Sequence, residues 1–282
     1  MTRTQFLDAR RNVRKEIVAY LSIVIIGMLA SLSFLGIAYS AATLKKDALH
    51  YFNSRGLWDL EVASTLLLDE EDLESIRALP GVAAAERVWQ IDAKVRVVEN
   101  DTNVSVMSLP GEISRPVLLE GRLPEKASEC AVEKELLDSC GLSLGQELTL
   151  EGGAVSDIEP LLVRRCVITG VFQTPDHITF MVSATPYVLV PEESFNREGL
   201  DGAFMKVRIR VEGAPEDRYG DAYRAAVGPV QEALEALGKE RAGTGGCGLK
   251  QEVVAVQRMA LFHYAPGGFL EPYPPDLVEI FI

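Results

Sequence analysis

The sequence predicts an α+β protein with one N-terminal transmembrane helix followed by a two-lobed extracytoplasmic domain. Three observations lead to this fold class. An uncharged, mostly apolar run covers residues 17–39. From residue 58 onward, strand-like alternation is interleaved with helical periods, which is typical of a mixed α/β layer. Between residues 111 and 200, glycine and proline separate shorter segments, and this change of texture predicts a second, smaller, β-rich lobe.

The run at residues 17–39 predicts a helix that crosses the cell membrane. At about 1.5 Å per residue, it spans a hydrocarbon core of about 30 Å. Basic residues outnumber acidic ones in residues 1–16, so we expect a cytoplasmic N-terminus and an extracytoplasmic location for the bulk of the chain. A cleaved signal peptide is the alternative, because Ala38-Tyr39-Ser40 and Ser40-Ala41-Ala42 match a small-x-small cleavage site. Signal peptides have a shorter apolar region, which favours the uncleaved anchor.

A stalk and a first lobe are expected after the membrane helix. Residues 40–57 form the stalk, because residues 41–54 contain helix formers and no glycine or proline. Residues 58–110 and 201–237 are assigned to the mixed α/β lobe. Its first strand is expected at residues 58–64, where apolar and acidic side chains alternate.

A short helix and two strands should continue this lobe. Asp69 has the position of an N-cap, and Asp72 follows three residues later in the position of a capping-box acid. Pro80-Gly81 ends the helix. Residues 93–97 and 104–106 alternate between apolar and polar side chains, which predicts two strands or one long bent hairpin.

The clearest strand in the chain is expected at residues 203–211. Alternation places three apolar side chains on one face and three cations on the other. We interpret the cations as a solvated face on an acidic domain, with a binding strip as the alternative. The apolar set is Val207, Ile209 and Val211, and the cationic set is Lys206, Arg208 and Arg210. A helix with one buried face should follow at residues 217–237, kinked or split at Gly228-Pro229.

The second lobe is assigned to residues 111–200. It should contain a short helix at residues 133–139 and strands at residues 146–150, 161–172 and 187–190. Residues 238–282 are expected to be an irregular tail. Their glycine-rich stretch lacks the Gly-Lys-Ser/Thr ending of a phosphate-binding loop.

Composition and motifs indicate no catalytic chemistry. The chain has 41 acidic and 28 basic residues, so no nucleic-acid partner is expected. No protease or hydrolase motif is present, and no catalytic, cofactor-binding or metal-ligating residue is assigned. We expect a protein that is not an enzyme; a hydrolase site assembled only in the folded chain is the alternative. The four cysteines form no C-x-x-C pair, and although the first two could pair across the short helix, the sequence leaves disulfide pairing open. They are Cys130, Cys140, Cys166 and Cys247.

Several segments, in their order and spacing, resemble a known family over about residues 10–237. The first is the basic lead-in and apolar helix from Arg10 to Tyr39. Next come Trp58-Asp59-Leu60, the acidic helix and Leu79-Pro80-Gly81-Val82. The most specific part of the resemblance consists of four segments: Glu120-Gly121-Arg122-Leu123-Pro124, Glu129-Cys130-Ala131-Val132, Gly141-Leu142-Ser143-Leu144-Gly145 and Leu148-Thr149-Leu150. This order resembles the N-terminal portion of ABC transporter permeases of the FtsX-like type, which includes the MacB and LolC/LolE group.

The resemblance implies a role. In such permeases the first helix leads into a two-lobed extracytoplasmic domain, and the Gly-Arg-x-Pro region belongs to the second lobe. A separate cytoplasmic ABC-type ATPase hydrolyses ATP, and the permease transmits its motion across the bilayer without a catalytic site or cofactor of its own. The expected partners are that ATPase, the remaining permease helices or a second permease subunit, and the lipid bilayer.

The C-terminal part departs from the family pattern. A permease of this type has at least three more membrane helices, and the residues from Gly238 to Ile282 contain none. We therefore expect a fragment or one part of a split permease. A single-pass anchored binding or sensor domain is the alternative function. The sequence does not name a transported substrate.

Overall fold

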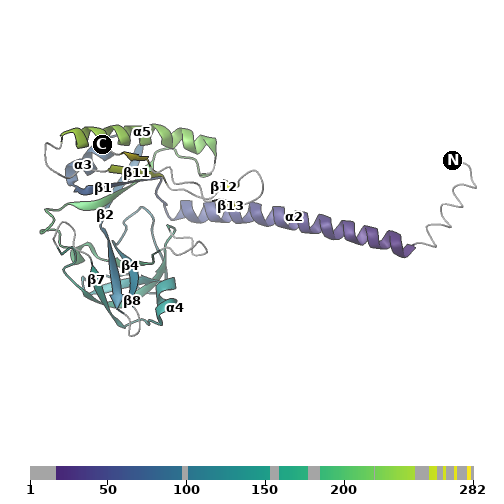
Figure 1. Cartoon of the computed structure of the whole chain (residues 1–282), viewed down its shortest axis with the longest axis horizontal. Helices are drawn as coiled ribbons and strands as arrows, with labels where there is room; N and C mark the ends of the chain where they lie inside the picture. Colours follow the sequence, from purple (N-terminus) through teal and green to yellow (C-terminus); the bar gives the residue numbers. More distant parts are fainter. Residues whose placement is uncertain are drawn as a thin grey trace, which may run out of the picture. The chain divides into compact units, whose positions relative to one another are not determined.

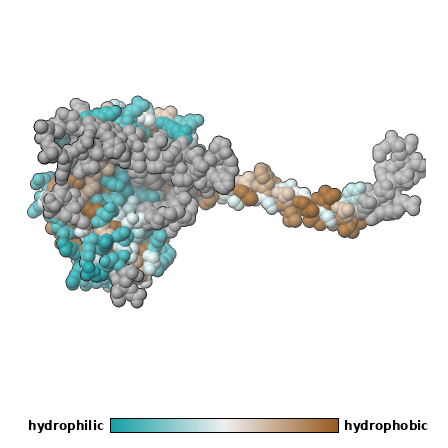
Figure 2. Space-filling view, in the orientation of Figure 1, coloured by the Kyte–Doolittle hydropathy of each residue, from teal (hydrophilic) through white to brown (hydrophobic). Residues whose placement is uncertain are grey.

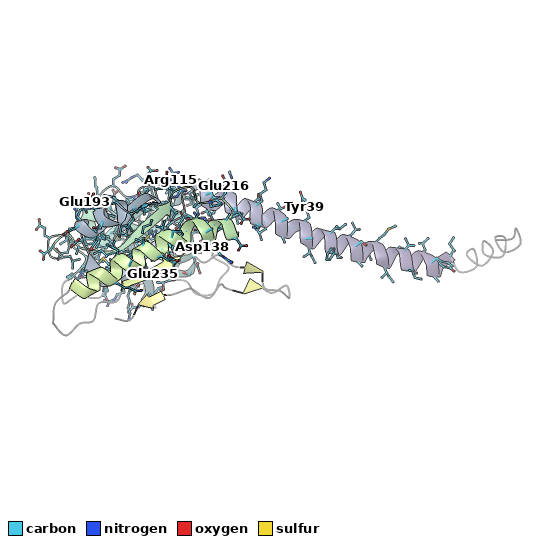
Figure 3. The ribbon with its side chains drawn as sticks, turned by 90° about the horizontal axis from the view of Figure 1, so that it is seen from above. Tyr39, Arg115, Asp138, Glu193, Glu216 and Glu235 are labelled. Atoms are coloured by element: carbon cyan, nitrogen blue, oxygen red, sulfur yellow. The ribbon has the colours of Figure 1, made fainter. Side chains whose placement is uncertain are left out.

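The computed structural model describes residues 17–96, 101–152, 159–176, 185–218 and 220–244, together with four short strands nearer the C-terminus. It divides into two compact units, Met1–His50 and Tyr51–Ile282. The first unit consists of most of helix α2 (Ile17–Ser54). By length and composition this helix could cross a membrane. Between Ile17 and Leu44 its large apolar side chains are exposed, and Tyr39 is one of them (Figures 2 and 3).

Among the residues that the structure describes, the second unit contains two large sheets and one two-stranded hairpin. The first has five strands, all antiparallel, in the order β14-β11-β1-β10-β2. Helix α5 packs on β11, β1 and β10, and helix α3 packs on β2 (Figure 1). The elements are β1 (Leu60–Leu68), α3 (Glu70–Arg77), β2 (Val82–Val88), β10 (Phe204–Val211), α5 (Asp221–Thr244), β11 (Val254–Arg258) and β14 (Val278–Ile280).

The second sheet curls into a small barrel. Its strand order is β5-β8-β6-β9-β4-β3-β7, and an added β7–β8 pairing closes six of the seven strands on themselves. β5 stays outside this ring and pairs only with β8 among the described strands. The elements are β3 (Gln90–Arg96), β4 (Asp101–Ser108), β5 (Val117–Gly121), β6 (Glu129–Glu133), α4 (Lys134–Cys140), β7 (Glu147–Gly152), β8 (Arg165–Gln173), β9 (Tyr187–Val190) and the 3-10 turn η1 (Glu192–Ser194). A separate hairpin joins β12 (His263–Tyr264) to β13 (Leu270–Glu271).

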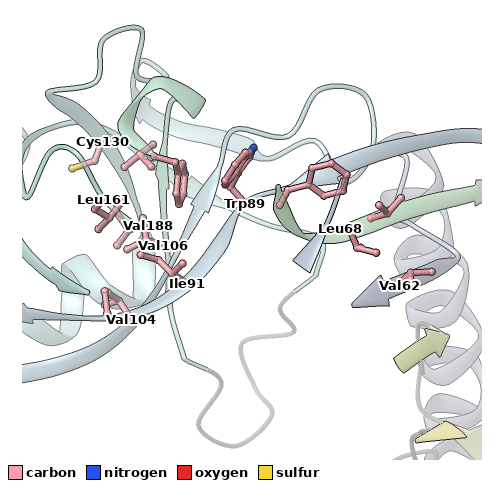
Figure 4. Close-up of a cluster of buried hydrophobic side chains, with 14 of the residues drawn as sticks. Val62, Leu68, Trp89, Ile91, Val104, Val106, Cys130, Leu161 and Val188 are labelled. Carbon is pink, nitrogen blue, oxygen red and sulfur yellow. The ribbon is translucent and has the colours of Figure 1, made fainter. Parts of the chain in front are cut away.

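One hydrophobic core runs through both sheets. Trp89 lies at the β2–β3 connection with 1% exposure. Its ring is 5.7 Å from that of Phe195 and 6.5 Å from that of Phe204. Figure 4 shows Trp89 between barrel side chains such as Val188 and sheet side chains such as Val62. The two sheets therefore share a packed interior, and a substitution at Trp89 would disturb both.

Several sequence-based predictions are confirmed. The fold combines an apolar N-terminal helix with a mixed α/β domain and a β-rich part. Asp69 caps α3, and the reciprocal hydrogen bonds of a capping box to Asp72 are present. β9 covers the expected residues 187–190, and Val207 and Ile209 are fully buried in β10.

Three expectations are corrected. β3 and β4, which were grouped with the α/β lobe as part of residues 58–110, belong to the barrel, because β3 pairs with β4 and β7 and β4 pairs with β9. Residues 238–282 are not wholly irregular, since β11 and β14 extend the first sheet beyond β1. Of the two outcomes expected at Gly228-Pro229, a kink or a split, the split is wrong, because α5 is one helix that continues through Pro229 to Thr244.

Candidate functional site

The described residues contain no group of three or more His, Cys, Asp or Glu side chains that could hold a metal ion. What stands out instead is a set of buried ion pairs where the end of α2 enters the domain. These pairs connect the chain after α2 to β10, to the start of α5 and to the barrel. We describe them in two parts. The base clamp consists of residues 52–59 together with Arg218. The inter-sheet network consists of Glu61, Lys206, Arg208 and Asp176.

The base clamp fixes the residues that directly follow α2. Phe52 is buried, and the Leu57 amide donates to the Phe52 carbonyl at 3.0 Å. Gly56 has φ +65°, and a Cβ there would lie 2.8 Å from the carbonyl oxygen of Glu112. The next residue, Leu57, has no exposed surface. Glycine at this position therefore allows the chain to turn tightly from helix into the core.

Backbone hydrogen bonds tie the clamp to the segment between β4 and β5. The Ser114 amide donates to the Gly56 carbonyl at 2.8 Å, and the Arg115 amide donates to the Arg55 carbonyl at 2.9 Å. Glu86 of β2 supports this segment from the other sheet, because its carboxylate accepts from the amide of Glu112 at 2.7 Å. The clamp is thus attached to a connection that leads into the barrel.

A buried arginine ties the other side of the clamp to the five-stranded sheet. Arg218, just before α5, donates to the carbonyls of Leu57 at 2.6 Å and Trp58 at 3.0 Å. Its guanidinium lies 2.8 Å from Asp59, and the Tyr223 hydroxyl donates to the same carboxylate at 2.8 Å. The side chains of Arg218 and Asp59 are only 4% and 2% exposed. A buried charge is tolerated because it is paired and hydrogen-bonded on several sides.

The end of α2 also contacts the β10–α5 connection directly. The Asn53 amide group donates to the carbonyl of Glu216 at 3.0 Å, and Arg115 donates to the carbonyl of Ser54 at 3.4 Å. Figure 3 shows Arg115 and Glu216 near this end of the helix. The last turn of α2 is therefore held by segments from both sheets.

The inter-sheet network lies on β1 and β10. These strands pair Glu61 with Arg208, and the carboxylate of Glu61 lies 2.8 Å from Lys206 and 3.2 Å from Arg208. Arg208 also lies 2.7 Å from Asp176, on the connection that follows β8 of the barrel. Arg208 is 2% exposed. It therefore joins the two sheets by pairing with one carboxylate from each.

The electrostatics of the network follow from burial and charge together. Burial alone would raise the pKa of Glu61, but the Arg208 and Lys206 cations hold that pKa below its usual value. Burial opposes the charge of Arg208, yet Asp176 and Glu61 raise its pKa. Burial raises the pKa of Tyr187 above its usual value, partly offset by Arg208.

The strip of three cations on β10 is thus not a solvated face. Arg208 is among the most buried side chains of the domain, and Lys206 is 28% exposed and paired. The alternation of the strand placed the cations correctly on one face. It could not reveal that Glu61, from a strand far away in sequence, covers that face.

The Gly-Arg-x-Pro segment has a structural explanation in the barrel. Arg122 makes a bidentate contact with Glu129, at 2.8 and 2.6 Å, where β6 begins. This contact and the Glu125 amide lower the pKa of Glu129 to about 2. Gly121 has φ +74° and packs against the backbone at Thr169 and Gly170, leaving no room for a Cβ. The motif holds the turn between β5 and β6 against β8.

Solved structures of two transporter domains are similar to this chain. No protein-family model matches the chain, and no curated protein matches it at a significant level. The structure is similar to the extracellular domain of YknZ, a noncanonic ABC-type transporter from Gram-positive bacteria, at 14% identity and a TM-score of 0.37 over 60% of this chain and 86% of that one. It is also similar to the periplasmic region of MacB from Actinobacillus actinomycetemcomitans, at 10% identity and a TM-score of 0.40 over 74% and 92%.

Proposed function

We propose that this chain is the membrane-anchored, extracytoplasmic part of an ABC-type permease of the FtsX-like kind. In this proposal its N-terminus is cytoplasmic, and it transmits the ATP-driven motion of a separate cytoplasmic ABC-type ATPase to the far side of the bilayer. The remaining permease helices or a second permease subunit complete the assembly. The chain itself carries out no catalytic step.

The observation that carries this proposal is the course of α2. It is one uninterrupted helix from Ile17 to Ser54, and the same element that could cross the membrane ends in the base clamp. A continuous helix passes a displacement from one end to the other, whereas a glycine-rich linker does not. Because the clamp is hydrogen-bonded to Ser114 and to Glu216, a displaced helix end would act on both sheets.

An insertion in the stalk tests this mechanism. Seven residues are close to two helical turns, so a seven-alanine insert after Leu44 keeps the helix and nearly keeps its phase. A seven-glycine insert of equal length removes the stiffness. In the complex with its ATPase, ATP should change hydrogen exchange at residues 112–115 and 216–218 in the parent and the alanine variant, and should leave both segments unchanged in the glycine variant. If ATP still changes hydrogen exchange at these segments in the glycine variant, the stalk only tethers the domain and does not transmit motion.

The partners are tested separately. The full chain is cross-linked in its native membrane and purified under denaturing conditions, and the adducts are identified by mass spectrometry. We expect an ABC-type ATPase and a multi-pass subunit. A matched variant, in which residues 17–39 are replaced by an unrelated membrane span of equal length, should lose both adducts. Recovery of the parent without either partner would favour the single-pass sensor instead.

A further inference from the structure

Three buried polar side chains at the inter-sheet network each have an atom without a hydrogen-bond partner among the described residues. These atoms are Trp58 Nε1, Arg208 Nη1 and Asp176 Oδ1. Trp58 is 6% exposed, and the side chains of Arg208 and Asp176 are 2% and 4% exposed. A buried polar atom without a hydrogen bond costs free energy, and folded proteins pair nearly all such atoms with protein groups or with ordered water.

The three side chains lie around one guanidinium. The central carbon of the Arg208 guanidinium is 6.0 Å from the centroid of the Trp58 ring, and its Nη2 lies 2.7 Å from Asp176. The contact with Asp176 is an ion pair by distance but is not aligned as a hydrogen bond, since neither carboxylate oxygen has a hydrogen-bond partner in the described part of the chain. Arg208 donates its Nε hydrogen to Glu61 at 3.2 Å, which leaves the hydrogens of Nη1 without an acceptor there.

The chemistry of the three atoms selects the class of ligand that would satisfy them. Trp58 Nε1 and Arg208 Nη1 can only donate hydrogen bonds, whereas the carboxylate of Asp176 can only accept them. An anion would be repelled by Asp176 and Glu61, and a cation would be repelled by Arg208. A small neutral molecule that accepts two hydrogen bonds and donates one satisfies all three atoms, and water has this capacity.

We propose that a bound water molecule bridges Trp58 Nε1, Arg208 Nη1 and Asp176 Oδ1 inside the domain. Three hydrogen bonds are typical of a buried water, and such a bridge is nearly as favourable as a direct hydrogen bond. Trp58 belongs to the base clamp, Arg208 to β10, and Asp176 to the connection that follows β8. The water would therefore join the clamp, the five-stranded sheet and the barrel. This binding site is independent of the proposed transport role.

The chain has only two tryptophans, so NMR can observe the water directly. The full-length chain is prepared in detergent micelles with ¹⁵N-labelled tryptophan, and a Trp58→Phe variant assigns the two indole signals. We expect the Trp58 indole hydrogen to give a rotating-frame cross-peak to the water resonance, with a sign opposite to the diagonal. That sign comes from a nearby bound water, whereas proton exchange gives the sign of the diagonal. A resolved Trp58 signal without this cross-peak would overturn the proposal.

Trp89 is the matched control within the same chain. Its indole nitrogen is also buried without a hydrogen-bond partner among the described residues, but its ring packs against the rings of Phe195 and Phe204. Apolar surroundings do not hold a water molecule, so the Trp89 indole hydrogen should give no cross-peak. A cross-peak of equal size at Trp89 would show that water enters the domain generally, and it would also overturn the proposal.

Two substitutions separate the bridge from a relayed signal. The buried Tyr51 hydroxyl exchanges its hydrogen with water and could pass on magnetisation, so the cross-peak should persist in Tyr51→Phe. Asp176→Leu removes the acceptor of the water and should abolish the cross-peak, while an unchanged Trp89 signal shows that the fold is kept. Loss of the cross-peak in Tyr51→Phe, or its persistence in a folded Asp176→Leu variant, would contradict a water held by these three side chains.

Discussion

Arg218 and Arg122 each pair with one carboxylate at short distance, but they lie in different surroundings. The Arg218–Asp59 contact is 2.8 Å long, and the Arg122–Glu129 contact is 2.6 Å long. The Arg218 side chain is 4% exposed, whereas that of Arg122 is 49% exposed. The shorter contact is therefore the more solvated one.

The distance between two charged groups therefore does not predict how much their pairing contributes to the stability of the fold. Removing one partner of a buried pair leaves the other charge without compensation, whereas water replaces a lost partner at the surface. The two sites also differ in what they hold. Arg218 fixes the chain that follows α2, while Arg122 fixes a turn at the rim of the barrel. We expect the base clamp to dominate stability and the motif arginine to matter little.

The largest effect is expected from Arg218→Met. The substitution keeps much of the side-chain length but leaves the Asp59 carboxylate buried and unpaired by charge, which costs about 3–5 kcal/mol in the free energy of unfolding. Denaturant unfolding of the purified chain measures it. The control is Arg165→Met, because Arg165 is 76% exposed and lies 3.7 Å from Glu147.

The double variant Asp59→Asn, Arg218→Met sharpens the same comparison. The double variant has no buried carboxylate without a counter-charge. Its loss in the free energy of unfolding should therefore be smaller than the sum of the losses of the two single variants. Additive losses would show that Arg218 acts through its hydrogen bonds to the Leu57 and Trp58 carbonyls and not through Asp59.

How much of this site was predictable depends on the sequence distance between partners. The capping box of Asp69 and Asp72 is local, and the sequence revealed it completely. Glu61 and Arg208 belong to strands far apart in the chain, so the alternation of β10 showed only that its cations share a face. Arg218 carried no signal, because its partners are two backbone carbonyls and a carboxylate from the start of the domain.

The predicted boundary between the two lobes was wrong for the same reason, because it depends on partners that are far apart in the sequence. β3 and β4 were grouped with their neighbours in sequence, yet their outer partners are β7 and β9, which come much later in the chain. Strand periodicity reports which face of a strand is buried, but it does not report which strand lies beside it. The membrane helix was found easily because its signal is local composition over a single segment.

An intermediate effect, dependent on pH, is expected from Glu61→Gln. The pKa of Glu61 is lower in the folded chain than its unfolded value of about 4.3, so the parent gains stability above that pH and loses it as pH falls through the folded pKa. At pH 7 the variant should be roughly 1–3 kcal/mol less stable, and the gap should narrow as the pH falls below about 4.

Thermal and denaturant melts between neutral and acidic pH measure this narrowing. Glu71→Gln is the control, because Glu71 is exposed at the start of α3. A gap between parent and Glu61→Gln that stays constant across this range would mean that the carboxylate contributes through its shape and not its charge.

The smallest effect is expected from Arg122→Ala. Its guanidinium is half solvated, and an exposed ion pair is weakened by the entropy of two long side chains and by screening. Glu129 would still accept from the Glu125 amide at 3.0 Å, so its carboxylate keeps one partner. We expect little change in Tm at low salt and none at high salt, measured beside Arg165→Ala. Arg122→Ala could instead destabilise the chain as strongly as Arg218→Met. Burial would then not determine how much each ion pair contributes to stability. The turn before β6 would contribute to closure of the barrel although it is exposed.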